Sequence, residues 1–143
     1  MFIKESELFK GIASHIIDEV AGLGTEEVFP AGHVLFQKGY SADFLYILEE
    51  GEVDITIEGQ KRLSFSVNQP ANVFGWSALV EPNQYTATAE CVKESKVIKL
   101  DGDRLMRIFE KHPSEGLKVM KRLAGVIATR LVNSYEEVIG SKA

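Results

Sequence analysis

The 143-residue sequence is poor in cysteine and contains no long apolar segment. Cys91 is its single cysteine, which excludes an intrachain disulfide and any zinc site built from several cysteines. No apolar run approaches the ~20 residues of a membrane span, and Lys4 and Glu5 interrupt any signal-peptide pattern. Basic residues (16) are fewer than acidic ones (21), and the net charge of −5 argues against nucleic-acid binding as the main function. These absences predict a cytoplasmic protein with a reduced thiol.

The hydrophobic pattern divides one predicted domain, residues 1–143, into a helical lead-in (1–24), a sheet region (25–100) and C-terminal helices (101–140). In the lead-in, Ile12, Ile16 and Val20 recur at the spacing of one helix face. Gly22 and Gly24 then end this predicted helix, because glycine tolerates the left-handed backbone that follows many helices.

Within the sheet region, apolar and polar residues alternate. Val53, Ile55 and Ile57 are apolar and the residues between them are polar, which is typical of a strand with one buried face. Residues 44–48 are apolar throughout, which predicts a strand buried on both faces. Glycines separate the strands at short intervals and indicate tight turns. We therefore predict a mainly β fold: an antiparallel β jelly roll (double-stranded β-helix) with N-terminal helices and a long C-terminal helix.

Two helices are predicted after the sheet. Asp101 suits the N-cap of a helix that His112-Pro113 ends, since the residue before a proline disfavours helical geometry. The following helix, 114–139, carries apolar or small residues at alternating intervals of three and four. Such a seam is typical of a coiled coil and consists of Leu117, Met120, Ala124, Ile127, Leu131, Ser134 and Val138. It predicts a homodimer through residues 114–139, while a second stripe around Leu123 offers a face for the sheet.

Three segments together are more specific than any one of them. They read PAGHVLFQKG (30–39), FLYILEEGEV (44–53) and FGWSAL (74–79), the last followed by YTATA (85–89). The sequence resembles the cyclic-nucleotide-binding domain of the catabolite-activator superfamily, over a stretch from about Leu8 to Ile139. The first two segments correspond to turns and strands of that fold, whereas the third corresponds to the family's phosphate-binding cassette.

The resemblance implies that the cassette holds the ligand. Gly75 allows the backbone to approach closely, and a short helical turn from Ser77 to Leu79 is predicted to point free N–H groups at an anion. In the family the long C-terminal helix closes over the ligand, so polar residues of this helix are candidates for a lid. The predicted cassette residues are Phe74, Gly75, Trp76, Ser77, Ala78, Leu79, Tyr85, Thr86 and Ala87, and the predicted lid residues are Asn133, Ser134 and Tyr135.

Two cassette positions depart from the family pattern. The family has a glutamate for the ribose hydroxyl and an arginine for the phosphate, where this sequence has Trp76 and Tyr85. A hydrogen bond to a charged group contributes ~1.5–3 kcal/mol, so losing both predicts that cyclic AMP and cyclic GMP bind roughly two to four orders of magnitude more weakly, or not at all. Two interpretations stay open. The two aromatic residues form the wall of a pocket for a different ligand, or they fill the former pocket.

Nothing in the sequence indicates an enzyme, because no nucleophile triad, paired carboxylates or Walker motif is evident. His15, His33 and His112 fall in different predicted elements, so we expect no metal site. Only three residues follow Gly140, and we expect no helix-turn-helix, no direct DNA binding and no membrane contact. We predict a non-enzymatic sensor or regulatory module with a nucleotide or another small ligand and a downstream protein partner. The alternatives are a ligand-free dimerising scaffold and a sensory fragment of a longer regulator.

Overall fold

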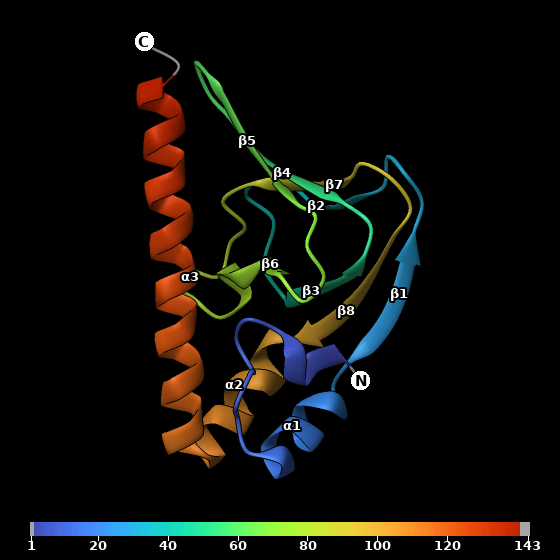
Figure 1. The fold of residues 1–143 in the computed structure, drawn as a ribbon, viewed down its shortest axis with the longest axis vertical. Coiled ribbons are helices and arrows are strands. Elements are labelled where there is room, and N and C mark those ends of the chain that lie inside the picture. Colours follow the sequence, from blue (N-terminus) through green and yellow to red (C-terminus); the bar gives the residue numbers. More distant parts are fainter. Residues whose placement is uncertain (1, 141–143) are drawn as a thin grey trace.

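The computed structural model describes residues 2–140, which form two antiparallel sheets with helices at one end and along one side (Figure 1). The helical elements are the 3₁₀ turn η1 (Phe2–Glu5), α1 (Ser14–Ala21), the 3₁₀ turn η2 (Trp76–Ala78), α2 (Gly102–Lys111) and α3 (Pro113–Gly140). The strands are β1 (Thr25–Phe29), β2 (Val34–Phe36), β3 (Phe44–Glu50), β4 (Val53–Glu58), β5 (Arg62–Val67), β6 (Val73–Phe74), β7 (Thr88–Cys91) and β8 (Ser95–Asp101).

The strands form two four-stranded sheets within residues 2–140, in the orders β1-β8-β3-β6 and β2-β7-β4-β5. Every pairing is antiparallel, and strands far apart in sequence lie side by side, as β1 does with β8. The predicted jelly roll with flanking helices is therefore confirmed. The predicted alternation of β4 is confirmed at Val53 and Ile55, which are buried, but not at the end of the strand, where Thr56 is buried and Ile57 is exposed. Ile55 lies opposite Phe65 of β5, and both face the interior of the roll.

Strand β3 explains why one segment of the sequence is apolar at every position. Leu45 and Ile47 pack in a cluster with the helices, whereas Tyr46 and Leu48 pack in a second cluster between the two sheets. Successive side chains of a strand point to opposite faces, so a strand between two cores needs apolar residues throughout. The prediction of a strand buried on both faces is confirmed.

Helix α3 lies within one residue of its predicted bounds, and α1 ends at Ala21, before Gly22. Gly22 has a φ of −64°, so the left-handed backbone expected after α1 is not present there. The side chain of Asp101 accepts a hydrogen bond from the backbone N–H of Arg104 at 3.0 Å and caps α2. Helix α2 ends at Lys111, and α3 begins at Pro113 after the break at His112. Figure 1 shows α3 running beside the roll from α2 to the level of β5. One side of the predicted binding region is therefore formed by α3.

The predicted seam of α3 lies along the boundary between the buried and the exposed side of the helix. Met120, Ile127 and Ser134 turn toward the body of the protein, whereas Leu117 and Leu131 are exposed. Val119 and Leu123 are fully buried, so the side centred on Leu123 packs on the core, as the second stripe predicted. Because the buried and exposed sides meet along the seam, its seven residues do not form one contact face.

Two predictions concern the ends of the chain and membranes. Residues 141–143, on which the expectation of no DNA-binding segment depends, lie outside the described residues. Between residues 2 and 140, no helix combines the length and the apolar composition needed to cross a bilayer.

Candidate functional site

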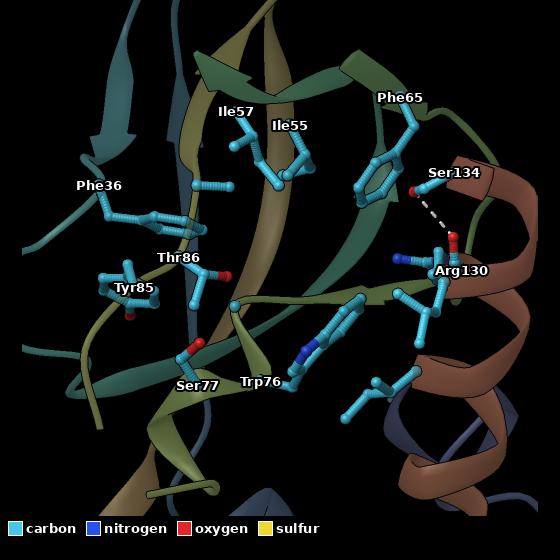
Figure 2. A pocket seen from close by; sticks show the side chains of 14 residues that line it. Phe36, Ile55, Ile57, Phe65, Trp76, Ser77, Tyr85, Thr86, Arg130 and Ser134 are labelled. Carbon is cyan, nitrogen blue, oxygen red and sulfur yellow. Dashed lines mark hydrogen bonds between the residues drawn. The ribbon is translucent and has the colours of Figure 1, made fainter. Parts of the chain in front are cut away.

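A cavity of about 210 Å³ lies between the sheet β2-β7-β4-β5, the cassette and α3. Figure 2 shows Phe36 and Tyr85 on one side of it, with Phe65, Trp76 and Arg130 on the other. Its lining is mostly apolar and combines residues that are more than 90 positions apart in sequence. The lining residues are Phe36, Ile55, Ile57, Phe65, Gly75, Trp76, Ser77, Tyr85, Thr86, Ala87, Ile127, Arg130, Leu131 and Ser134.

The cassette reaches the cavity through a sharp turn at Gly75. Its φ of 76° is left-handed, and an added Cβ would lie 3.1 Å from Tyr46 and 3.2 Å from the Phe44 carbonyl oxygen. In the turn that follows, the N–H groups of Ala78 and Leu79 donate back to the carbonyls of Gly75 and Trp76. The 3₁₀ turn itself therefore uses these two N–H groups, so they are not free for an anion, and an anion at the predicted turn would depend on N–H groups nearer its start.

Trp76, the residue in place of the family's glutamate, forms part of the cavity wall. Its indole ring is half-buried and packs against the helical core cluster. On its other side the ring centroid lies 5.1 Å from the guanidinium carbon of Arg130. The ring leaves the cavity unfilled, so the structure accommodates a pocket with an aromatic wall.

Tyr85, the residue in place of the family's arginine, is committed to the framework rather than to the cavity. Its ring stacks on Phe36 with centroids 3.8 Å apart. Its hydroxyl donates to the Phe44 carbonyl oxygen at 2.6 Å and accepts from the Phe44 N–H at 3.3 Å. Burial raises the pKa of Tyr85 to about 12, so the phenol stays neutral. The hydroxyl is therefore engaged by the main chain on both its donor and its acceptor side, and it offers no free donor to an anion in the cavity.

Arg130 is the functional candidate that the sequence analysis missed. It projects from α3, and its Nη2 atom donates to the Val73 carbonyl oxygen at 3.3 Å and lies 3.5 Å from Glu7. Its Nη1 atom is buried and has no hydrogen-bond partner. Burial lowers the pKa of Arg130, and Glu7 partly opposes this effect. Arginine stays protonated even so, and the cavity wall contains a positive charge with one unused donor.

The structure brings together part of the predicted site. Seven predicted residues line the cavity: Gly75, Trp76, Ser77, Tyr85, Thr86, Ala87 and Ser134. Phe74, Ala78 and Leu79 are instead buried in the core, where they support the cassette. Tyr135 is exposed, and Asn133 borders a separate surface depression. The ligand-binding role of all these residues stays a prediction.

The sequence analysis also missed the apolar wall contributed by β2, β4, β5 and α3. Phe36, Ile55, Phe65 and Ile127 belong to this wall. Their alternation marked them as core residues, but it does not distinguish a packed interior from a cavity lining. Ile57 shows this directly, because it alternates in the sequence in the same way as the buried Val53 and Ile55, yet it lines the cavity and is 39% exposed.

Comparisons with known proteins agree with this geometry. The family model for the cyclic nucleotide-binding domain matches residues 26–112. The chain is 27% identical over 127 residues to a CRP-like cAMP-activated global transcriptional regulator from Mycobacterium tuberculosis, covering 87% of this chain and 54% of that protein. It is 25% identical to the cyclic AMP receptor protein of Thermus thermophilus, covering 90% and 59%. The chain thus spans a little over half the length of these relatives.

Solved structures share the fold. A cyclic nucleotide-binding domain from Methylobacillus flagellatus matches with a TM-score of 0.82 and 17% identity, covering 98% of this chain and 80% of that one. The catabolite activator protein of Thermus thermophilus matches with a TM-score of 0.75 and 21% identity, covering 96% and 63%. At these identities the likeness establishes the architecture alone.

Proposed function

This chain belongs to the cyclic nucleotide-binding domain family, and from that premise we propose that it is a non-enzymatic sensor module whose cavity binds a small ligand other than a cyclic nucleotide. The observation that carries the proposal is the cavity of about 210 Å³, which remains although aromatic residues occupy both altered cassette positions. A scaffold without a ligand has no need of such a space, since protein interiors are otherwise close-packed.

We propose that cyclic AMP and cyclic GMP bind weakly or not at all. The ribose contact lacks its carboxylate because Trp76 stands there, and Tyr85 supplies no cation for the phosphate. The Tyr85 hydroxyl is moreover bonded to Phe44 on both its donor and its acceptor side. A phosphate placed in the cassette would therefore meet few donors, apart from those on Ser77 and Thr86.

We also propose that the module acts as a homodimer through α3. The exposed side of this helix carries a row of small and apolar residues at the spacing of a coiled-coil seam: Ala124, Ala128, Leu131 and Tyr135. Leu131 also borders the cavity, so a ligand there would be sensed next to the proposed interface. A downstream protein that reads the dimer would complete the regulatory function. The buried free thiol of Cys91 suits a cytoplasmic location.

Thermal unfolding with a defined set of probes tests the sensor proposal. The probes are cyclic AMP, cyclic GMP, and single-ring carboxylates with their neutral amides. The variant Ser134→Phe places a ring in the cavity, whereas Asn133→Phe adds the same ring at an exposed position outside the cavity lining. At a ligand concentration 100 times the dissociation constant, stabilisation is about 2.7 kcal/mol, or roughly 5–10 °C for a chain of this length.

We expect at least one probe to raise the unfolding temperature of the wild type and of Asn133→Phe, with no rise for Ser134→Phe. If a probe raises the unfolding temperature of all three proteins equally, its binding site is outside this cavity. If no probe raises the unfolding temperature of any of the three proteins, the interpretation as a ligand-free dimerising scaffold replaces the sensor proposal. The third alternative, a sensory fragment of a longer regulator, keeps the same cavity and the same expected result.

A further inference from the structure

We infer that the cavity recognises a compact, apolar monocarboxylate and that Arg130 of α3 binds the carboxylate group. This inference rests on the proposed function, because it names the ligand class of the same cavity. It assigns the charged contact to the long helix rather than to the cassette.

The charge of the cavity lining determines the sign of the charge that a ligand should carry. Among the described residues that line it, Arg130 alone is charged. Its Nη1 atom is buried without a hydrogen-bond partner, and a buried charged donor left in that state is destabilising. An anionic oxygen supplied by a ligand would satisfy this donor with a charge-assisted hydrogen bond. The unliganded site is thus incomplete in a way that an anion corrects.

The surroundings of the guanidinium direct it toward the cavity. Its Cζ atom lies 5.1 Å from the ring centroids of both Phe65 and Trp76, so two aromatic rings hold it in place. Figure 2 shows Arg130 extending from α3 toward the space between these rings. Because Nη1 is covered in this arrangement, we expect the side chains around the guanidinium to shift when a carboxylate binds, and Trp76 lies beside it in the cavity wall. Ligand binding is therefore expected to change the environment of that indole.

The remaining lining determines the body of the ligand. Ile55, Ile57 and Ile127 contribute aliphatic side chains to the cavity wall, and the stacked rings of Phe36 and Tyr85 line one side of it. Such a wall favours an apolar group and gives a sugar few partners. The volume of about 210 Å³ is below the ~300–1,000 Å³ of pockets for drug-sized ligands, which points to a single ring or a short branched chain.

The same features disfavour inorganic phosphate and a phosphate monoester. Arg130 already lies 3.5 Å from Glu7, so the positive charge available to a ligand is shared. A dianionic phosphate would carry a second charge that no described lining residue compensates, and an unpaired buried charge is costly. A monocarboxylate needs one cation and one or two donors. Arg130 supplies the cation, and the hydroxyl of Ser77 or Thr86, which also lines the cavity, is a further donor.

Intrinsic fluorescence provides a direct assay, because Trp76 is the only tryptophan in the chain. The 143-residue chain is titrated with benzoate, with its neutral isostere benzamide, and with inorganic phosphate and cyclic AMP. A ligand of about ten non-hydrogen atoms reaches millimolar affinity or better at ordinary ligand efficiency, so the titration extends to about 10 mM. We expect a saturable change with benzoate and at least a tenfold weaker effect with the other three probes.

Variants of two arginines on the same helix assign the contact. Arg130→Met removes the proposed partner, and we expect it to weaken benzoate binding by roughly 10- to 100-fold. Arg122→Met is the matched control, because Arg122 lies two turns earlier and donates to the carbonyls of Leu8 and Lys10, outside this cavity. We expect this control to bind benzoate as the wild type does. Arg130→Lys keeps the charge and tests the contact if Arg130→Met unfolds, with an intermediate affinity expected.

The outcomes separate this inference from the proposed function. If benzoate and benzamide bind equally, or if Arg130→Met and Arg130→Lys bind benzoate as tightly as the wild type, the carboxylate inference is wrong while the sensor stands. Preferential binding of inorganic phosphate also overturns it and keeps the sensor. Preferential binding of cyclic AMP overturns both, because the proposed sensor binds a ligand other than a cyclic nucleotide. Absence of any saturable benzoate signal overturns the inference on its own, since the sensor is judged by the wider probe set and the Ser134→Phe variant.

Discussion

Restoring the two missing charges of the cassette should convert this domain into a better receptor for cyclic nucleotides. The change is the double variant Trp76→Glu with Tyr85→Arg, which introduces a carboxylate for the ribose hydroxyl and a guanidinium for the cyclic phosphate. Two hydrogen bonds to charged groups contribute about 3–6 kcal/mol together, or roughly 10²- to 10⁴-fold in affinity. The structure reduces this ideal gain for two reasons.

The first reduction arises at position 76. The indole ring of Trp76 lies 5.1 Å from the guanidinium carbon of Arg130, so a carboxylate introduced there gains a competing partner. The second reduction arises at position 85, because Tyr85→Arg removes two hydrogen bonds with Phe44 and the stacking on Phe36. These losses cost about 1.5–4.5 kcal/mol of stability, compared with the 5–15 kcal/mol typical of a domain. We therefore expect a folded but less stable protein with a gain of at least tenfold.

Calorimetric titration with cyclic AMP measures the affinity, and urea unfolding measures the stability. The control variant Trp76→Gln with Tyr85→Met removes the same rings without adding charge, and it should lose stability without gaining affinity. The single variant Tyr85→Phe isolates the hydroxyl and should lose about 1–3 kcal/mol while leaving the cavity unchanged. Micromolar cyclic AMP binding by the wild type would refute the reasoning about the two positions. A folded double variant with no gain in affinity would refute it as well.

Three further predictions concern the dimer, the helix packing and the acid stability. The wild type should be a dimer by light scattering. The double variant Ala124→Glu with Ala128→Glu should be monomeric, because it places two charges in the exposed row of α3. A monomeric wild type would contradict this prediction. A methyl group at Gly116 would lie 2.7 Å from an α2 side chain, so Gly116→Ala should lose about 1–3 kcal/mol in urea unfolding. A methyl group at Gly125 would have no atom within 4 Å, so Gly125→Ala should raise the free energy of unfolding by about 0.5–1 kcal/mol. Equal effects at the two glycines would be inconsistent with this packing. The pKa of Glu19 lies below its ordinary 4.5 because a lysine and a histidine near the end of α2 contact its carboxylate. These contacts therefore stabilise the fold fully above pH 4.5, and the stabilisation is lost as the pH falls through the lowered pKa. Glu19→Gln should flatten the acid limb of stability against pH, and an unchanged slope would count against the contact.

Local patterns in the sequence were sufficient for the architecture. The apolar run of β3, the capping carboxylate of Asp101 and the break at Pro113 all act within a few residues, and the structure confirms each of them. The turn at Gly75 was predictable for the same reason, since only glycine adopts its left-handed backbone without strain beside Tyr46. These features depend on backbone geometry and on the period of the elements, which a sequence displays directly.

The chemistry of the cavity depended on tertiary structure. Arg130 meets Glu7 across 123 positions and reaches the aromatic wall because α3 packs beside the roll, which no local period encodes. The direction of the Tyr85 hydroxyl is decided by the Phe44 backbone, 41 positions away. The rotation of α3 is likewise set by burial around Leu123, whereas its heptad spacing is compatible with either side facing the core. A linear pattern specifies which residues share a face, but the contacts between distant segments decide what that face meets.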